Sequence, residues 1–205
     1  MTTVLLKQAV PANDAFLTEG EKIEEIALHV SSILKVLGLD LEDESLRDTP
    51  MRVAKMYVEE IFSGLNPELK PKITLFENTS DYKEMLVEKD ITFFSYCEHH
   101  LVPFFGVAHI AYFPQKHIVG LSKINRLVQF LARKPQVQER LTSEVGRELQ
   151  RALRTNDIAV VMEAQHLCIA SRGVEDTKSV TRTSFFSGKF TEKEIKDEYL
   201  RNIET

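Results

Sequence analysis

Two short segments contain the residue types that bind zinc. Cys97, His99 and His100 fall within four positions, and His166 and Cys168 lie two residues apart much later in the chain, which has only these two cysteines. Thiolate and imidazole are ligands that suit Zn²⁺. A Cys-x-x-His pair with one distant cysteine supplies three protein ligands and leaves the fourth position to water. That pattern is typical of a catalytic rather than a structural zinc site.

The two cysteines also have simpler explanations. A free cysteine is most often a small buried residue, and a disulfide between Cys97 and Cys168 would need an oxidising compartment. Both cysteines stand close to histidines in the sequence, and this favours a metal site. The spacing leaves open whether His99 or His100 is the ligand. The other imidazole would then be available for proton transfer, because imidazole titrates near neutral pH.

A group of cations in the middle of the chain would suit a phosphate. Lys123 and Arg126 are three residues apart at the start of an expected helix, so they share a face near the positive end of the helix dipole. Backbone N–H groups at a helix start bind phosphate well. Arg172, four residues after Cys168, adds a cation beside the expected metal. From these residues alone, a solvated basic helix end is the simpler interpretation.

Three further charged residues have an ordinary explanation, and one of them also has a functional one. Glu139 lies in the first turn of another expected helix, where a carboxylate is ordinary. The same carboxylate could accept two N–H groups from a planar, guanine-like edge. Arg52 and Lys55 lie on an earlier expected helix and are surface charges by default.

The apolar periodicity predicts the elements that must position these residues. Helices are expected over residues 22–37, 49–64, 122–134 and 136–153, and strands over residues 85–96, 101–113, 158–170 and 178–190. This ααββααββ order predicts an α+β fold with an antiparallel sheet. In the third strand His166 and Cys168 would point to the same face.

Length and composition narrow the class of protein. A chain of 205 residues predicts one compact domain with a small appendage. The formal net charge of −5 argues against a broad nucleic-acid surface, but a pocket with its own cations can still bind a small anion. No apolar run approaches the length of a membrane span, and the N-terminus lacks the pattern of a secretory signal. We therefore expect a cytoplasmic protein with no nucleic-acid or membrane partner.

Five segments, taken in order, resemble the GTP cyclohydrolase I family. They are TPMRVAKMY (49–57), CEHH (97–100), GLSKINR (120–126), PQVQER (135–140) and AQHLC (164–168), the last followed by Arg172-Gly173. The resemblance extends over about residues 20–200. It implies the tunnelling fold, a ββααββ antiparallel sheet with helices on one face, preceded by N-terminal helices. We accordingly expect a flexible segment over residues 1–17, a helical region over 18–80 and a catalytic domain over 81–205.

The resemblance implies a role for each matching residue. It makes Cys97, His100 and Cys168 the ligands of Zn²⁺, and so selects His100 over His99. The residues implied in catalysis are the proton-transfer pair His99 and His166, together with Ser122 and Gln138 near the ribose and the reacting atoms.

Substrate binding is implied for a second set of residues. Glu139 matches the carboxylate that holds the guanine edge. The implied triphosphate contacts are Lys123, Arg126 and Arg172, with Arg52 and Lys55 offered by a neighbouring subunit.

The family activity implied is zinc-dependent hydrolysis and rearrangement of GTP. Such a hydrolase acts on cyclic amidine C–N bonds and forms 7,8-dihydroneopterin triphosphate and formate, the first step of pterin and tetrahydrofolate biosynthesis. Water activated by zinc attacks C8 of guanine while His166 or His99 protonates N7, and an Amadori rearrangement of the ribose follows. The implied assembly is a homodecamer of two pentamers with active sites at subunit interfaces.

Two other functions are alternatives to GTP hydrolysis. A zinc-binding or nucleotide-binding module without turnover would leave His99 and His166 idle. Another tunnelling-fold pterin or deazapurine enzyme would use different nucleophile or histidine patterns, which residues 97–100 and 122–126 do not fit. The sequence departs from the family pattern at Phe185 and Phe186, which are bulkier than the small residues common there. The short N-terminal segment predicts no long regulatory extension.

Overall fold

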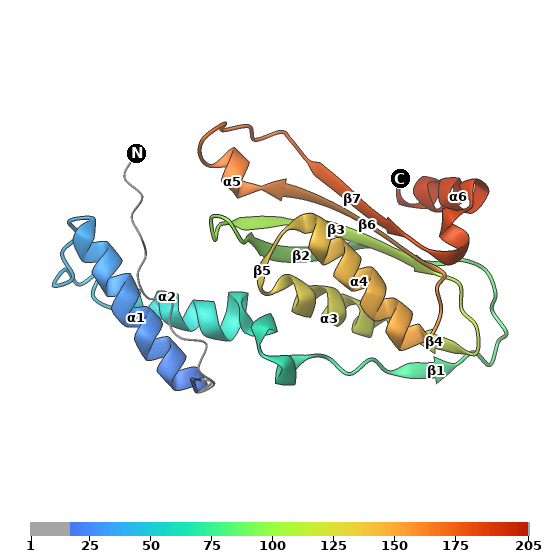
Figure 1. Ribbon diagram of the computed structural model, residues 1–205, viewed down its shortest axis with the longest axis horizontal. Helices are drawn as coiled ribbons and strands as arrows, with labels where there is room; N and C mark the ends of the chain where they lie inside the picture. Colours follow the sequence, from blue (N-terminus) through green and yellow to red (C-terminus); the bar gives the residue numbers. More distant parts are fainter. Residues whose placement is uncertain (1–16, 205) are drawn as a thin grey trace, which may run out of the picture. The chain divides into compact units, whose positions relative to one another are not determined.

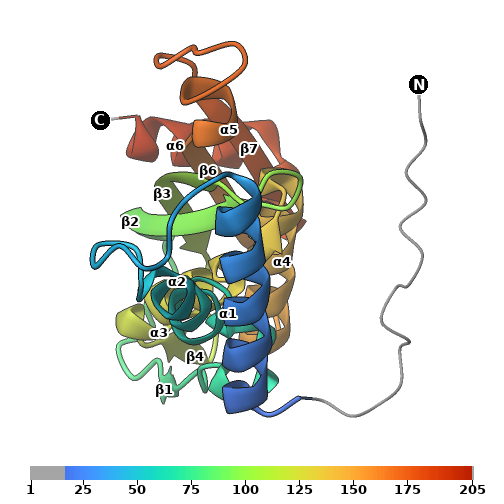
Figure 2. The ribbon, with the colours of Figure 1, turned by 90° about the vertical axis from the view of Figure 1, so that its left-hand side faces the viewer.

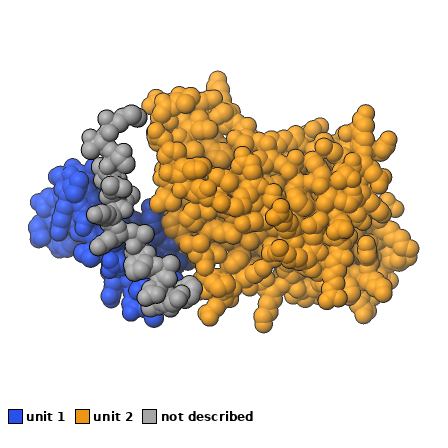
Figure 3. All heavy atoms as spheres, in the orientation of Figure 1, with its two compact units in different colours: residues 1–59 blue, residues 60–205 orange. Residues whose placement is uncertain are grey.

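The structure, a computed structural model, describes residues 17–204. The chain divides into two compact units, residues 1–59 and residues 60–205 (Figure 3). The flexible segment expected over residues 1–17 lies outside the described residues except for Leu17. The functional boundary expected between residues 80 and 81 stays a prediction.

Helices build the N-terminal unit, and further short helices begin the second unit. Helix α1 (Glu19–Val36) begins at a capping box, in which the Thr18 side chain accepts from Glu21 N and the Glu21 carboxylate accepts from Thr18 N. Helix α2 (Thr49–Lys55) has a proline in its first turn. The helix expected over residues 49–64 is interrupted, because its second part forms other helix types. These are the π-helix η1 (Met56–Ile61) and the short 3₁₀ helices η2 (Ser63–Leu65) and η3 (Pro67–Leu69).

A five-stranded sheet in the order β5-β2-β3-β6-β7 forms the centre of the second unit (Figure 1). The strands are β2 (Leu86–Cys97), β3 (Pro103–Tyr112), β5 (Pro135–Gln136), β6 (Ile158–His166) and β7 (Thr181–Phe186). All neighbours pair antiparallel except the two-residue β5, which runs parallel to β2. The predicted α+β class with an antiparallel sheet is confirmed. The small sheet of β1 (Leu75–Glu77) and β4 (His117–Val119) was not predicted.

Helices cover both faces of this sheet (Figures 1 and 2). Helices α3 (Leu121–Ala132) and α4 (Gln138–Leu153) pack on one face, and α6 (Lys193–Ile203), preceded by the 3₁₀ helix η4 (Gly188–Thr191), packs on the other. Successive side chains of a strand point to opposite faces of the sheet, so each face has its own hydrophobic core. Ile110 belongs to the core under α3 and α4, and Ala111 belongs to the core under α6. None of the described helices is long and apolar enough to cross a membrane.

The bulky Phe185 has a counterpart in the opposing helix. A Cβ atom added to Gly146 of α4 would lie 2.3 Å from the Phe185 ring. The missing side chain of Gly146 therefore makes the space that Phe185 occupies, so this departure from the family pattern is absorbed by packing.

The strand expected over residues 158–170 is shorter than predicted. Strand β6 ends at His166, and Cys168 lies in the short helix α5 (Leu167–Ala170). The ladder ends there because β7 pairs with β6 only as far as Ala164, and β3 only as far as His166. The expectation that His166 and Cys168 share one face of a strand is therefore wrong.

Candidate active site

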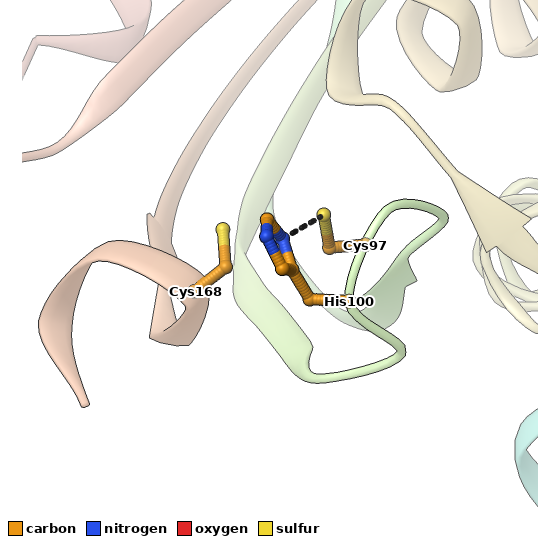
Figure 4. A group of neighbouring side chains, drawn as sticks. All are labelled: Cys97, His100 and Cys168. Carbon is orange, nitrogen blue, oxygen red and sulfur yellow. Dashed lines mark hydrogen bonds between the residues drawn. The ribbon is translucent and has the colours of Figure 1, made fainter. Parts of the chain in front are cut away.

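Two thiols and one imidazole meet at the end of the sheet (Figure 4). The ligand atoms of Cys97, His100 and Cys168 all lie within 4.8 Å of one another, and His100 Nδ1 lies 3.7 Å from Cys97 Sγ. Tetrahedral zinc with ordinary bond lengths separates a sulfur ligand from a nitrogen ligand by about 3.6 Å. Cys97 is buried, Cys168 is half-buried and His100 is exposed. The group therefore fits a metal ion that keeps one side open for a further ligand.

The hairpin between β2 and β3 positions two of these ligands. Cys97 N donates to Val102 O at 2.9 Å, and Leu101 N donates to Cys97 O at 2.8 Å. Leu101 adopts a left-handed conformation with φ of 54°, which lets the chain reverse within a few residues. The tight turn holds Cys97 and His100 on one short segment, while α5 brings Cys168 from the far end of β6.

The two sulfurs influence each other. Burial and the neighbouring Cys97 thiol raise the pKa of the Cys168 thiol, and Arg172 opposes that rise. A divalent cation between the sulfurs would favour both thiolates, because a bound cation outweighs the repulsion between them. The donor set is thus suited to a cation.

His99 stays at the edge of the group. Its Nδ1 lies 3.7 Å from Cys97 Sγ, but its side chain is 64% exposed and its Nε2 lies 3.9 Å from the Glu98 carboxylate. Its ring therefore has room to approach a bound molecule from the solvent side.

Gln138 is buried and holds the ring of His166. The Gln138 amide nitrogen donates to Met162 O at 3.1 Å, Thr181 O at 3.0 Å and Thr183 Oγ1 at 3.1 Å. These acceptors orient the amide, so its oxygen faces His166 Nε2 at 2.8 Å. His166 must then donate from Nε2, which assigns the Nε2–H tautomer from the hydrogen-bond network and leaves Nδ1 free to exchange a proton.

A ring contact completes the environment of His166. The fully buried Phe104 stacks on the imidazole with centroids 4.7 Å apart and planes 5° apart. Burial lowers the pKa of His166, and the nearby Glu139 carboxylate opposes that shift. Phe104 was not identified in the sequence, because only the register between β3 and β6 places it opposite His166.

The first turns of α3 carry the expected phosphate contacts. Ser122, Lys123 and Arg126 follow the N-cap Gly120, and no side chain caps this helix start. Lys123 and Arg126 form no ion pair with other residues in 17–204. The helix start therefore offers N–H groups and two cations to an anion.

The remaining expected contacts are spread over other elements. Arg172 is exposed after α5, and Glu139 is exposed in the first turn of α4. Arg52 and Lys55 lie on α2 in the other compact unit, and their part in the site stays a prediction.

Comparison with known proteins gives a family for this site. A family model described as GTP cyclohydrolase I matches residues 26–204. The chain belongs to the GTP cyclohydrolase I family. A Flavobacterium johnsoniae protein named GTP cyclohydrolase 1 is 54% identical over 191 residues, covering 93% of this chain and 86% of the relative.

Two further relatives carry the same name. The Vibrio cholerae protein is 52% identical over 180 residues, covering 88% of this chain and 83% of the relative. The Shewanella loihica protein is 49% identical over 203 residues, covering 98% of this chain and 95% of the relative. The family expected from the sequence motifs is therefore confirmed over nearly the whole chain, and its tunnelling fold agrees with the antiparallel sheet and helices described above.

Proposed function

We propose that this chain is a GTP cyclohydrolase that forms 7,8-dihydroneopterin triphosphate and formate, the first step of pterin and folate biosynthesis. The observation that carries the proposal is the Cys97–His100–Cys168 group at the end of the sheet, in a chain of the GTP cyclohydrolase I family. We assign this group to Zn²⁺. Zinc held by three protein ligands supplies Lewis acidity and activates water near neutral pH.

His166 is the proton donor that the geometry favours. Gln138 engages its Nε2–H, so Nδ1 is the nitrogen that takes up a second proton, which makes the ring an imidazolium, and passes that proton to N7 of guanine when C8 is attacked. Phe104 and Gln138 hold the ring on one face and one edge, which keeps the donor atom at one position. His99, exposed beside Cys97, is the second proton-transfer group. Ser122 is assigned to the ribose.

Glu139 is assigned to recognition of the base. Within residues 17–204 its carboxylate forms no hydrogen bond or ion pair, and its charge acts on the nearby His166. A free carboxylate can accept the two N–H groups at the guanine edge. Adenine presents no such pair and would leave the carboxylate unpaired, so the site should discriminate strongly against ATP.

The triphosphate is assigned to cations on several elements. Lys123 and Arg126 meet it at the start of α3, and Arg172 joins them from the segment after α5. Arg52 and Lys55 are assigned to the site of a neighbouring subunit, in a homodecamer of two pentamers. The family motifs support this assembly, and mass measurement in solution tests it. The cytoplasmic location also stays a prediction.

The deciding experiment is turnover of GTP by the purified protein. The zinc-loaded protein should convert GTP to a product that becomes a fluorescent neopterin after oxidation, and should release formate. A chelator should stop the reaction, added zinc should restore it, and ATP should give no product. A zinc-loaded, folded protein that leaves GTP unchanged would refute the proposal.

A further inference from the structure

An ion pair links the metal-ligand turn to helix α4. Glu98 lies between Cys97 and His100 in the turn, and its carboxylate pairs with the Arg140 guanidinium in the first turns of α4. The side chains are 33% and 44% exposed, respectively. An ion pair so open to solvent contributes little to stability by itself. Its location suggests another role, because it joins two segments of the site that are 42 residues apart.

A buried amide locks this ion pair in place. Arg140 Nε donates to Gln136 Oε1 at 2.9 Å, and Glu98 N donates to Gln136 O at 3.0 Å. Gln136 is only 1% exposed and is itself held, because its amide nitrogen donates to Leu131 O at 3.2 Å and to Glu144 Oε2 at 3.0 Å. Glu98 is thus tied to Gln136 through its backbone and to Arg140 through its side chain, and the contacts form a closed ring.

The direction of the Arg140 side chain also matters for its neighbour. Arg140 follows Glu139 directly in α4, yet it pairs with Glu98. Successive residues of a helix point in different directions, and the Glu139 carboxylate forms no ion pair within residues 17–204, so it keeps its capacity to accept hydrogen bonds. The contact with Arg140 balances the charge of Glu98 beside the metal ligands.

We infer that Arg140 and Glu98 are positioning residues that hold the metal-ligand turn against the first turn of α4. The inference rests on the proposed function, in which the turn carries Cys97 and His100 and the helix carries the base-binding Glu139. With the ring closed, the metal ligands and the base-binding carboxylate keep a constant separation. With the ring open, only the backbone contacts with β5 still tie the turn to the segment before α4, and the separation between the metal ligands and the base-binding carboxylate varies more.

Zinc release without substrate tests this inference directly. In the zinc-loaded protein, Arg140→Gln should release zinc to a chelator about tenfold faster. The reason is that loss of a contact that orients metal ligands typically lowers metal affinity by about 10- to 100-fold. Arg140→Gln should also lower kcat for GTP at temperatures far below unfolding. Arg151→Gln on the same helix, whose ion pair with Glu148 involves no residue of the turn, is the matched control. Arg140→Gln should have a lower Tm than Arg151→Gln, because it also leaves the oxygen of the buried Gln136 amide without its donor, so zinc release is measured far below both Tm values.

A double-mutant cycle shows whether Glu98 and Arg140 act through their shared contact or destabilise the zinc site independently. Glu98→Gln and Arg140→Gln should accelerate zinc release similarly, and the double variant should be no faster than either one, because each opens the same ring. Additive effects, or release within twofold of the unsubstituted protein, would overturn the inference. If Arg140→Gln does not fold, Glu98→Gln alone, compared with Arg151→Gln, decides the inference. Failure of the unsubstituted zinc protein to turn over GTP would refute the proposed function instead, while zinc release would still decide this inference.

Discussion

Replacement of Gln138 by methionine tests how the site holds its proton donor. The two side chains have similar length and volume, so the change removes polar contacts without opening a large cavity. Four contacts of 2.8–3.1 Å are lost: three acceptors share the two N–H groups of the amide nitrogen, and the amide oxygen accepts from His166. Each hydrogen bond contributes about 1 kcal/mol net. Allowing for the apolar packing of methionine, we expect a loss of about 3 kcal/mol in the free energy of unfolding.

Stability and turnover should both respond to Gln138→Met. In a chain of this size the loss of unfolding free energy corresponds to a fall in Tm of roughly 6–12 °C. Because the chain has no tryptophan, Tm is measured by far-ultraviolet circular dichroism, with the zinc-loaded protein at one fixed concentration. His166 would no longer be held in one tautomer, so kcat for GTP should fall by about tenfold or more. Kinetics are measured well below the Tm.

Gln150→Met is the matched control on the same helix. Gln150 makes a single side-chain hydrogen bond, from Nε2 to Ser187 Oγ at 3.0 Å, so this variant should lose about 1 kcal/mol and keep its kcat. If Gln138→Met were no less stable than Gln150→Met and turned over GTP normally, the proposed function of the Gln138 network would be refuted.

Three other substitutions probe the metal ligands, a buried charge and the sheet. Cys168→Ser should lose both bound zinc and turnover, whereas His99→Ala should keep its zinc in metal analysis and lose turnover. Burial raises the pKa of the Glu88 carboxyl, so the native state loses stability as pH rises through that pKa. Glu88→Gln should therefore be about 1 kcal/mol more stable than the unsubstituted protein at about pH 8. At about pH 4 the two proteins should be equally stable. Gly106→Ala would place a Cβ 1.8 Å from Glu163 O, so β3 and β6 must separate there, and chemical unfolding should show a loss of about 3 kcal/mol.

Each of these predictions has an outcome that contradicts it. Loss of zinc from His99→Ala would make His99 a ligand. An equal gain for Glu88→Gln at both pH values would show that the buried charge is not the cause. Gly20→Ala is the control for the glycine substitution, because nothing lies within 4 Å of the added Cβ. A loss in Gly106→Ala as small as in this control would contradict the strand-contact argument.

Local patterns predicted the order of the main helices and strands and the family, but not every element's bounds. Periodicity of apolar residues is imposed by the backbone geometry of helices and strands, so the main elements of the second unit were recognisable without tertiary information. Cys97 was accessible from its position beside two histidines, whereas the spacing left His99 and His100 open and the family motif selected His100. The prediction was wrong where an element ended: nothing in the local pattern showed that β6 would lose its neighbours at His166.

The sequence by itself determined the residue types available for chemistry, the α+β order of elements and the family motifs. Only the tertiary structure decided which of these residues meet and which nitrogen of His166 is free. Gln138 and His166 are 28 residues apart, and Glu98 and Arg140 are 42 apart. Such contacts depend on strand register and on how α4 packs against the sheet. Short-range backbone preferences do not encode them, because a polar side chain has the same local pattern whether it faces solvent or a buried partner.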